Sequence, residues 1–155
     1  DQDDIWREDK IETMLILMQQ SPEYQVGMHN ARLVTADLVP LEVSKMDRIK
    51  RANGDLEDFV QGSCSVIRKQ LLGVALPVPL FAPAHDNWIA LITHFLESRL
   101  LTEKRLLKYR IHGQNTSTFH LNQPAGSKPR RVFGEKLRSP DSSSDFLKLH
   151  GDISH

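Results

Sequence analysis

The sequence predicts an α+β protein that is mostly α-helical and ends in a helix–helix–β-hairpin unit. Apolar side chains return every three or four positions as far as about Leu100, which is the period of a helix with one buried face. Beyond that point they return at every second position, which is the period of a strand with one buried face. The change of period divides the chain into a helical part and a short β-ribbon.

The first third of the chain is acidic and is expected to be mainly helical. Asp3 and Asp4 are good N-caps for a helix that runs to about Gln20. A second, short helix is expected to begin at Ser21, which a proline follows. Residues 32–43 are rich in Val and Leu but contain a proline, so they are expected to form an edge strand or an irregular arm over the core.

Three further helices are expected. Ser44 and Asp47 resemble a capping box and open a helix that should stop near Asn53 and Gly54. Apolar residues at helical spacing predict a helix over residues 55–72 and another over residues 86–100. The stretch LPVPLFAP between these two cannot be helical because of its prolines, and is expected to be an extended strap on the core.

A β-hairpin is expected over residues 106–121. Apolar and polar residues alternate in both of its strands, and only a loop with an odd number of residues, centred on Asn115, places both apolar sets on one face. The buried face then consists of Leu107, Tyr109, Ile111, Phe119 and Leu121, and the outward face consists of Lys108, Arg110, His112, Thr118 and His120.

The order of the expected elements over residues 55–122 resembles the winged-helix superfamily. Residues 55–72 match an earlier helix, residues 86–100 the recognition helix and residues 106–121 the wing. The resemblance implies a domain that binds nucleic acid. The helix in the recognition position departs from the superfamily, because few of its residues could contact base edges: Asn87, Thr93, His94 and Arg99. The resulting division is an acidic helical segment over residues 1–54, a winged-helix-like unit over residues 55–122 and a flexible tail over residues 123–155.

Basic residues are concentrated in one part of an otherwise neutral chain. Lys plus Arg equals Asp plus Glu overall, but residues 102–138 hold nine bases against two acids. Such a stretch can neutralise several phosphates of a nucleic acid. The alternative is that these are ordinary solubilising side chains that also discourage edge pairing. The candidate nucleic-acid-binding residues are Lys104, Arg105, Lys108, Arg110, Lys128, Arg130 and Arg131.

No residue pattern predicts a metal, a cofactor or a catalytic centre. The seven histidines do not occur as HxxxH or HExxH, and the single cysteine, Cys64, excludes zinc sites that need CxxC. Cys64 has apolar neighbours and is expected to be a buried, inert thiol. His85 and Asp86 are interpreted as a helix start, with Asp86 as the cap.

The expected function is that of a non-enzymatic binding module in an intracellular, nuclear protein. It would contact nucleic acid through the basic hairpin and arm, and another protein through its helical half. The motif KPRR is compatible with a nuclear address. No membrane partner is expected, because the apolar runs are short and broken by proline. The alternatives are a protein-interaction or scaffold subunit without nucleic-acid binding, and a piece of a catalytic domain whose active residues lie elsewhere.

Overall fold

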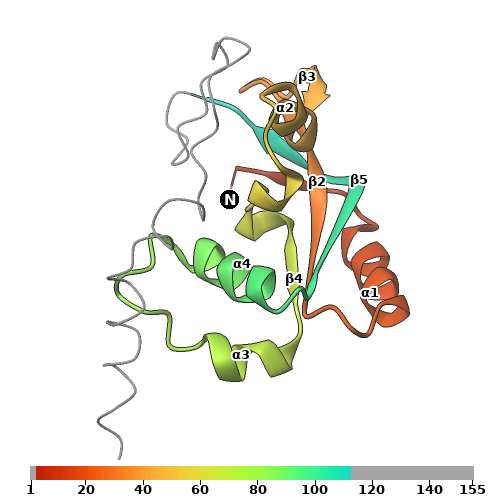
Figure 1. Ribbon diagram of the computed structural model, residues 1–155. Helices are drawn as coiled ribbons and strands as arrows, with labels where there is room; N and C mark the ends of the chain where they lie inside the picture. Colours follow the sequence, from red (N-terminus) through yellow and green to blue (C-terminus); the bar gives the residue numbers. More distant parts are fainter. Residues whose placement is uncertain (1–2, 113–155) are drawn as a thin grey trace, which may run out of the picture.

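The computed structural model describes residues 3–112, and in this range the protein is a balanced α+β fold. Within these residues, four α-helices accompany a five-stranded mixed sheet (Figure 1). The prediction of a mostly helical domain that ends in a helix–helix–β-hairpin unit is therefore wrong. The error has a physical cause: the strand over residues 26–34 is buried on both faces, so it lacks the alternation by which a strand is found in a sequence.

The sheet takes strands from both ends of the described chain. The strands are β1 (Ile5–Trp6), β2 (Val26–Val34), β3 (Pro40–Ser44), β4 (Ser65–Ile67) and β5 (Arg99–Arg110). Their order is β1-β5-β2-β3, and β4 also pairs with β2. β5 runs parallel to β2 and antiparallel to β1. A parallel pair needs a long crossover connection, which the segments between β2 and β5 provide.

Helices cover both sides of this sheet. They are α1 (Lys10–Gln20), α2 (Lys45–Arg51), α3 (Lys69–Ala75) and α4 (His85–Phe95), with two 3-10 turns, η1 (Leu56–Asp58) and η2 (Gly62–Cys64). α1 lies on one side of β2 and β5, whereas α3 and α4 lie on the other (Figure 1). α1 comes close to β2 at Gly27, where a Cβ atom would lie 2.7 Å from Sδ of Met18. No helix of the described range is both long and apolar enough to span a bilayer.

An irregularity in β2 changes which of its side chains face the main core. Val26 and Met28 point into this core, and after a break in the register with β5 around His29 and Asn30, the residues that do so are Ala31 and Leu33. The side chain of Asn30 supports the break, because it donates to Oγ of Ser44 (2.9 Å) and accepts from the backbone N of Met46 (3.1 Å). Across the break β5 has three additional residues relative to β2, because His29 is opposite Thr102 whereas Ala31 is opposite Leu107.

The first expected helix begins later than predicted. Asp3 and Asp4 are not its caps, because residues 5 and 6 pair with β5 as a short strand, with Trp6 opposite Leu107. The helix α1 starts at Lys10 and ends at Gln20, as expected. The short helix predicted at Ser21 is absent from the structure of that stretch, which is a turn. Tertiary pairing and the turn thus override the local capping signals.

The helix predicted over residues 55–72 is also wrong. Asp55 does cap a turn, but the chain continues as η1, η2 and β4 before α3 begins at Lys69. The apolar residues Phe59, Cys64 and Leu71 are buried as expected, although irregular backbone carries two of them. The apolar residues of this stretch recur at helical intervals because they pack into the same core, although they do not lie on one helix.

Several local predictions are confirmed. Ser44 and Asp47 form a capping box at the start of α2, and α4 covers most of the predicted helix over residues 86–100, although Ala84 and not Asp86 is its cap. In β5, Leu107 and Tyr109 are buried and Lys108 is exposed. β5 has β1 and β2 as its neighbours, and the second strand of the predicted hairpin lies outside the described residues.

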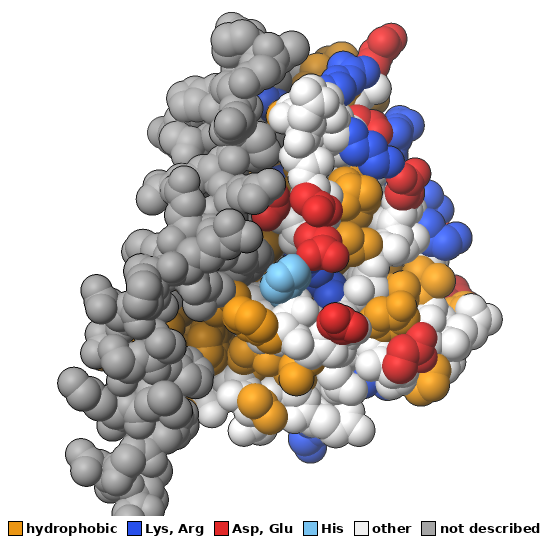
Figure 2. Space-filling model, in the orientation of Figure 1, with side chains coloured by type: hydrophobic (Ala, Val, Ile, Leu, Met, Phe, Trp, Pro, Cys, Tyr) orange, Lys and Arg blue, Asp and Glu red, His pale blue; other side chains and the backbone are white. Residues whose placement is uncertain are grey.

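The proline-rich connection between α3 and α4 is not a strap that covers the core. Figure 2 shows apolar side chains gathered on the surface around these two helices. Leu80 and Phe81 are exposed, and the ring of Phe81 packs edge-on against Trp88, with 5.9 Å between the ring centroids. The Trp88 indole donates to the carbonyl of Ala75 (2.9 Å), which joins α4 to the end of α3.

Candidate functional site

The structure places four of the predicted nucleic-acid-binding residues on one strand. Lys104, Arg105 and Lys108 are exposed on β5, and Arg110 is half-buried at its end. They lie on a strand that is hydrogen-bonded to two others, and not on a projecting wing. Lys128, Arg130 and Arg131, together with the predicted tail, lie outside the described residues.

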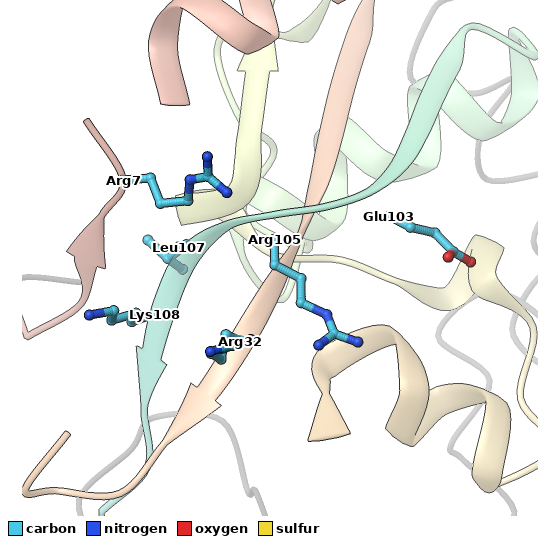
Figure 3. A pocket seen from close by; sticks show the side chains of 6 residues that line it. All are labelled: Arg7, Arg32, Glu103, Arg105, Leu107 and Lys108. Atoms are coloured by element: carbon cyan, nitrogen blue, oxygen red, sulfur yellow. The ribbon is translucent and has the colours of Figure 1, made fainter. Parts of the chain in front are cut away.

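Two of these residues contribute to a shallow depression, which we call the basic hollow (Figure 3). It has a volume of about 400 Å³ and is lined by Arg7, Arg32, Glu103, Arg105, Leu107 and Lys108. Arg7 follows β1, Arg32 lies on β2, and the other lining residues lie on β5. Sequence reasoning missed Arg7 and Arg32, because only the pairing of distant strands brings them beside Lys108.

Acids partly neutralise the basic hollow. Arg7 forms an ion pair with Asp9 (2.6 Å), and Arg105 forms one with Asp47 (3.1 Å). Glu103, the acid in the lining, is engaged with Lys50. Arg32 and Lys108 are opposite each other in the register of β2 and β5, and neither has an ion pair with another residue in the described range. Two cationic residues therefore occupy register-paired positions on neighbouring strands.

A second group of polar side chains converges from segments that are far apart in the sequence; we call it the polar cluster. It consists of Asp3, Asp4, Lys10, His29, Lys45, the loop Gln61–Cys64, Asp86, Arg110 and His112. In Figure 1 the amino terminus lies beside the 3-10 turns that carry this loop. Sequence analysis assigned Asp3, Asp4 and Asp86 to helix caps, so it did not identify this group.

Ser63 lies at the centre of the polar cluster. Its carbonyl accepts a hydrogen bond from Nζ of Lys10 (2.6 Å), and its hydroxyl donates to Oδ2 of Asp4 (3.3 Å). The other oxygen of Asp4 accepts from the backbone N of Arg110 (3.2 Å). Lys10 and Asp4 therefore have neutral hydrogen-bond partners, and no ion pair joins these two side chains.

The loop Gln61–Cys64 connects this centre to α2 and α4. The Gln61 amide accepts a hydrogen bond from Nζ of Lys45 and donates to the Ser63 hydroxyl (3.0 Å). The backbone N of Gly62 donates to Oδ2 of Asp86 (3.2 Å). Nζ of Lys45 also lies 4.5 Å from the centroid of the Tyr109 ring. The loop is held in place by the complete burial of the side chain of Cys64 at its end.

Two histidines border the polar cluster, and they differ in burial and in hydrogen bonding. His112 lies 2.5 Å from Oδ2 of Asp3, and this hydrogen bond holds the pKa of Asp3 below its ordinary value. His29 is fully buried, and its Nδ1 lies 2.8 Å from the Asn30 carbonyl. Nε2 of His29 has no hydrogen-bond partner among the described residues. An unsatisfied buried nitrogen is unusual and marks a position where a further polar group would be stabilised.

Burial changes the protonation behaviour of the polar cluster. Loss of hydration raises the pKa of Asp4 and lowers that of Lys10. It lowers the pKa of Lys45 to about 8 and that of His29 to about 4. The pKa of the Cys64 thiol rises to about 12, so this thiol is protonated and inert at neutral pH. Several ionisable groups with such shifts in one place are typical of functional sites.

The described residues contain no group of three or more His, Cys, Asp or Glu side chains arranged to hold a metal ion. The chemistry that they offer is proton exchange at Asp4, hydrogen-bond acceptance by Asp86, and charge stabilisation by Lys10 and Lys45. Comparison with models of known protein families finds none that matches the chain. A search of curated proteins likewise finds no similar sequence.

Proposed function

We propose that the chain binds a small, phosphorylated and hydroxyl-bearing molecule at the polar cluster, as part of an enzyme-type site. The convergence of Asp4, Lys10, Lys45 and Asp86 around one short loop carries this proposal. The four side chains come from the N-terminal segment, α2 and α4, and the loop is a fourth part of the chain, so their meeting is a property of the fold. The pKa values of Asp4, Lys10 and Lys45 are shifted by burial, and ionisable groups with such shifts are typical of a site for chemistry.

The cations determine which charge the ligand should have. Nζ of Lys10 donates to the Ser63 carbonyl, and Nζ of Lys45 donates to the Gln61 amide. Burial deprives both ammonium groups of part of their hydration, which costs free energy. An anionic group bound between them would offset this cost. A phosphate fits this requirement, because lysine side chains are common phosphate donors.

The carboxylates determine what else the ligand should carry. Asp4 and Asp86 each accept a hydrogen bond from a backbone N–H group and keep lone pairs available for further donors. Hydroxyl groups are suitable donors. Because burial raises the pKa of Asp4, its carboxylate is a stronger base than an ordinary aspartate and can accept the proton of a bound hydroxyl group.

Titration with three probes, followed by the amide NMR signals, tests the proposal. Glucose 1-phosphate carries both phosphate and hydroxyl groups, inorganic phosphate carries the first alone, and sorbitol carries the second alone. We expect glucose 1-phosphate to shift the amide signals of Gly62, Ser63 and Arg110 at lower concentration than either of the other probes. Lys45→Met should weaken the binding of the two phosphate-containing probes. Asp4→Asn should weaken the binding of the two hydroxyl-bearing probes, glucose 1-phosphate and sorbitol.

Two exposed residues on other surfaces supply matched controls. Asp37→Asn removes an exposed carboxylate, and Lys69→Met removes an exposed ammonium group, so both should leave the titrations unchanged. The proposal is wrong if the probes shift signals elsewhere in the protein, or if Lys45→Met and Lys69→Met have equal effects.

The nucleic-acid-binding role expected from the sequence concerns a different surface, since its described residues lie on β5. Among the predicted residues that the structure describes, Arg110 also contacts the polar cluster, through its backbone N. The nuclear, non-enzymatic module and the scaffold subunit both stay predictions, and neither depends on the polar cluster.

A further inference from the structure

We infer that the basic hollow is a contact site for single-stranded nucleic acid, with the backbone phosphates on Arg32 and Lys108 and a base on Trp6. The inference rests on the pairing of β2 with β5 and on an exposed indole next to it. It is independent of the function proposed for the polar cluster.

Arg32 and Lys108 are the centre of this site. Within β2, Arg32 is the one exposed residue between buried neighbours, and its partner across the strands is Lys108. Like charges that face each other directly on a sheet destabilise it. The other two bases of the hollow, Arg7 and Arg105, have acids within ion-pair distance. A phosphate between Arg32 and Lys108 would replace repulsion with two charge-assisted hydrogen bonds.

The shape of the basic hollow favours an extended polyanion over one small anion. Its basic side chains come from the end of β1, from β5 and from β2, so they extend across three neighbouring segments of the sheet (Figure 3). The hollow is partly open to solvent, whereas small ligands are usually held in concave, mostly enclosed pockets. A single-stranded nucleic acid carries a phosphate on every nucleotide, so its successive phosphates can contact successive basic side chains of the hollow.

Trp6 supplies the second element that single-strand binding needs. It lines a neighbouring hollow together with Ile5, and Arg7 and Lys108 line both hollows. The Trp6 side chain is 54% exposed, and Nζ of Lys10 lies 3.6 Å from the centroid of its ring. Lys10 thus holds the ring in place while much of the ring remains accessible. Stacking of a base on such a ring is tolerant of sequence.

Fluorescence anisotropy of a labelled twelve-nucleotide oligo(dT) tests the inference. We expect binding at low salt that weakens as salt is added. The double variant Arg32→Gln/Lys108→Gln should lose about tenfold or more in affinity, and the slope of log affinity against log salt should fall by about 1.4, since each single-strand phosphate contact contributes roughly 0.7. Trp6→Leu should weaken binding with no change in that slope.

A charge-matched double variant separates a site from a general charge effect. Arg51→Gln/Lys69→Gln removes two exposed bases from α2 and α3 and should retain the affinity and the salt slope of the unaltered protein. Circular dichroism melting of each variant verifies that it is folded. Equal losses in both double variants would overturn the inference. So would binding of inorganic phosphate or of phosphatidylserine vesicles through Arg32 and Lys108 in the absence of oligonucleotide binding.

Discussion

Lys45 of the polar cluster and Lys108 of the basic hollow carry the same ammonium group in two different surroundings. Lys45 is held by Gln61 against the ring of Tyr109, and burial lowers its pKa to about 8. Lys108 is exposed on β5, where its register partner on β2 is another cation, Arg32. One lysine is half-buried and largely desolvated, and the other lies in solvent.

The difference shows that burial determines whether pH or ionic strength controls the behaviour of a charged site. In the polar cluster, loss of hydration shifts protonation, so pH should govern stability and ligand binding. In the basic hollow, the charges are solvated and close to one another, so ionic strength should govern them. Variants that alter one dependence and leave the other unchanged therefore test whether the two sites are separate.

The largest expected effect concerns the anchor of the polar cluster. Phe59 is fully buried two residues before Gln61, at which the loop begins, so Phe59→Ala should lower the free energy of unfolding by about 3–5 kcal/mol. Phe81→Ala, at a residue that is 68% exposed, should change it by less than about 0.5 kcal/mol. Urea denaturation measures both. Similar losses in the two variants would show that Phe59 does not anchor the loop.

The next effect is a dependence on acid. The folded-state pKa of His29 is about 4 and its ordinary value is 6.5, so between these values the unfolded chain binds a proton that the folded protein does not. Folding should therefore lose stability as the pH falls from 6.5 to 4, by roughly 2 kcal/mol from this residue. Urea denaturation across this range should give a flatter curve for His29→Gln than for the unaltered protein.

His85→Gln is the control for this measurement, because His85 is exposed at the start of α4. Its curve should follow that of the unaltered protein more closely than the curve of His29→Gln does. If His29→Gln leaves the pH dependence unchanged, burial of His29 does not contribute to acid sensitivity.

A smaller effect is expected from removing the buried ammonium group. Lys45→Met should raise the free energy of unfolding at pH 7 by about 1 kcal/mol, because an apolar side chain of similar length avoids the cost of desolvating a charge. Between pH 8 and 10.5 the folded protein has released the Lys45 proton while the unfolded chain still binds it, so the unaltered protein gains stability there.

The advantage of Lys45→Met should therefore shrink as the pH rises through this range. Lys108→Met serves as the matched substitution in the basic hollow and should show no such trend. Denaturation at pH 7, 8, 9 and 10 distinguishes the two lysines. A constant difference between Lys45→Met and the unaltered protein at all four values would contradict the lowered pKa.

The smallest effect should depend on salt. Arg32→Thr removes one of two facing cations, so it should stabilise the protein by about 0.5 kcal/mol at low ionic strength. At about 1 M salt, where charges are screened within roughly 3 Å, the gain should vanish. Thermal denaturation at both salt concentrations measures the difference. A gain that persists at high salt would have to come from the strand propensity of threonine and not from charge.

The parts of the fold that could be predicted are those with local causes. The capping box of Ser44 and Asp47 joins residues three positions apart, and it starts α2 as expected. The alternation of Leu107, Lys108 and Tyr109 likewise predicts which side chains of β5 are buried. Both signals are contained in a few consecutive residues.

The remaining parts depend on contacts between distant segments. Residues 5 and 6 became a strand because they pair with β5, about a hundred positions later, and this pairing removed Asp3 and Asp4 from the helix that they were expected to cap. The same applies to the candidate sites. Lys108 could be selected from its exposure on a strand, whereas Arg32 could not, because nothing near it in the sequence indicates its neighbour. The polar cluster draws on even more segments, so no spacing pattern predicts it.

The irregular step at His29 and Asn30 has a consequence for how the two sites coexist on one strand. If the alternation of Val26 and Met28 continued unbroken, the side chain at position 32 would point into the hydrophobic core. An arginine could not be accommodated there, because its charge would be buried without a partner. The register shift, at which β5 has three additional residues relative to β2, accompanies a reversal of this alternation. As a result, the guanidinium group of Arg32 is exposed to solvent on the same strand that buries the imidazole of His29.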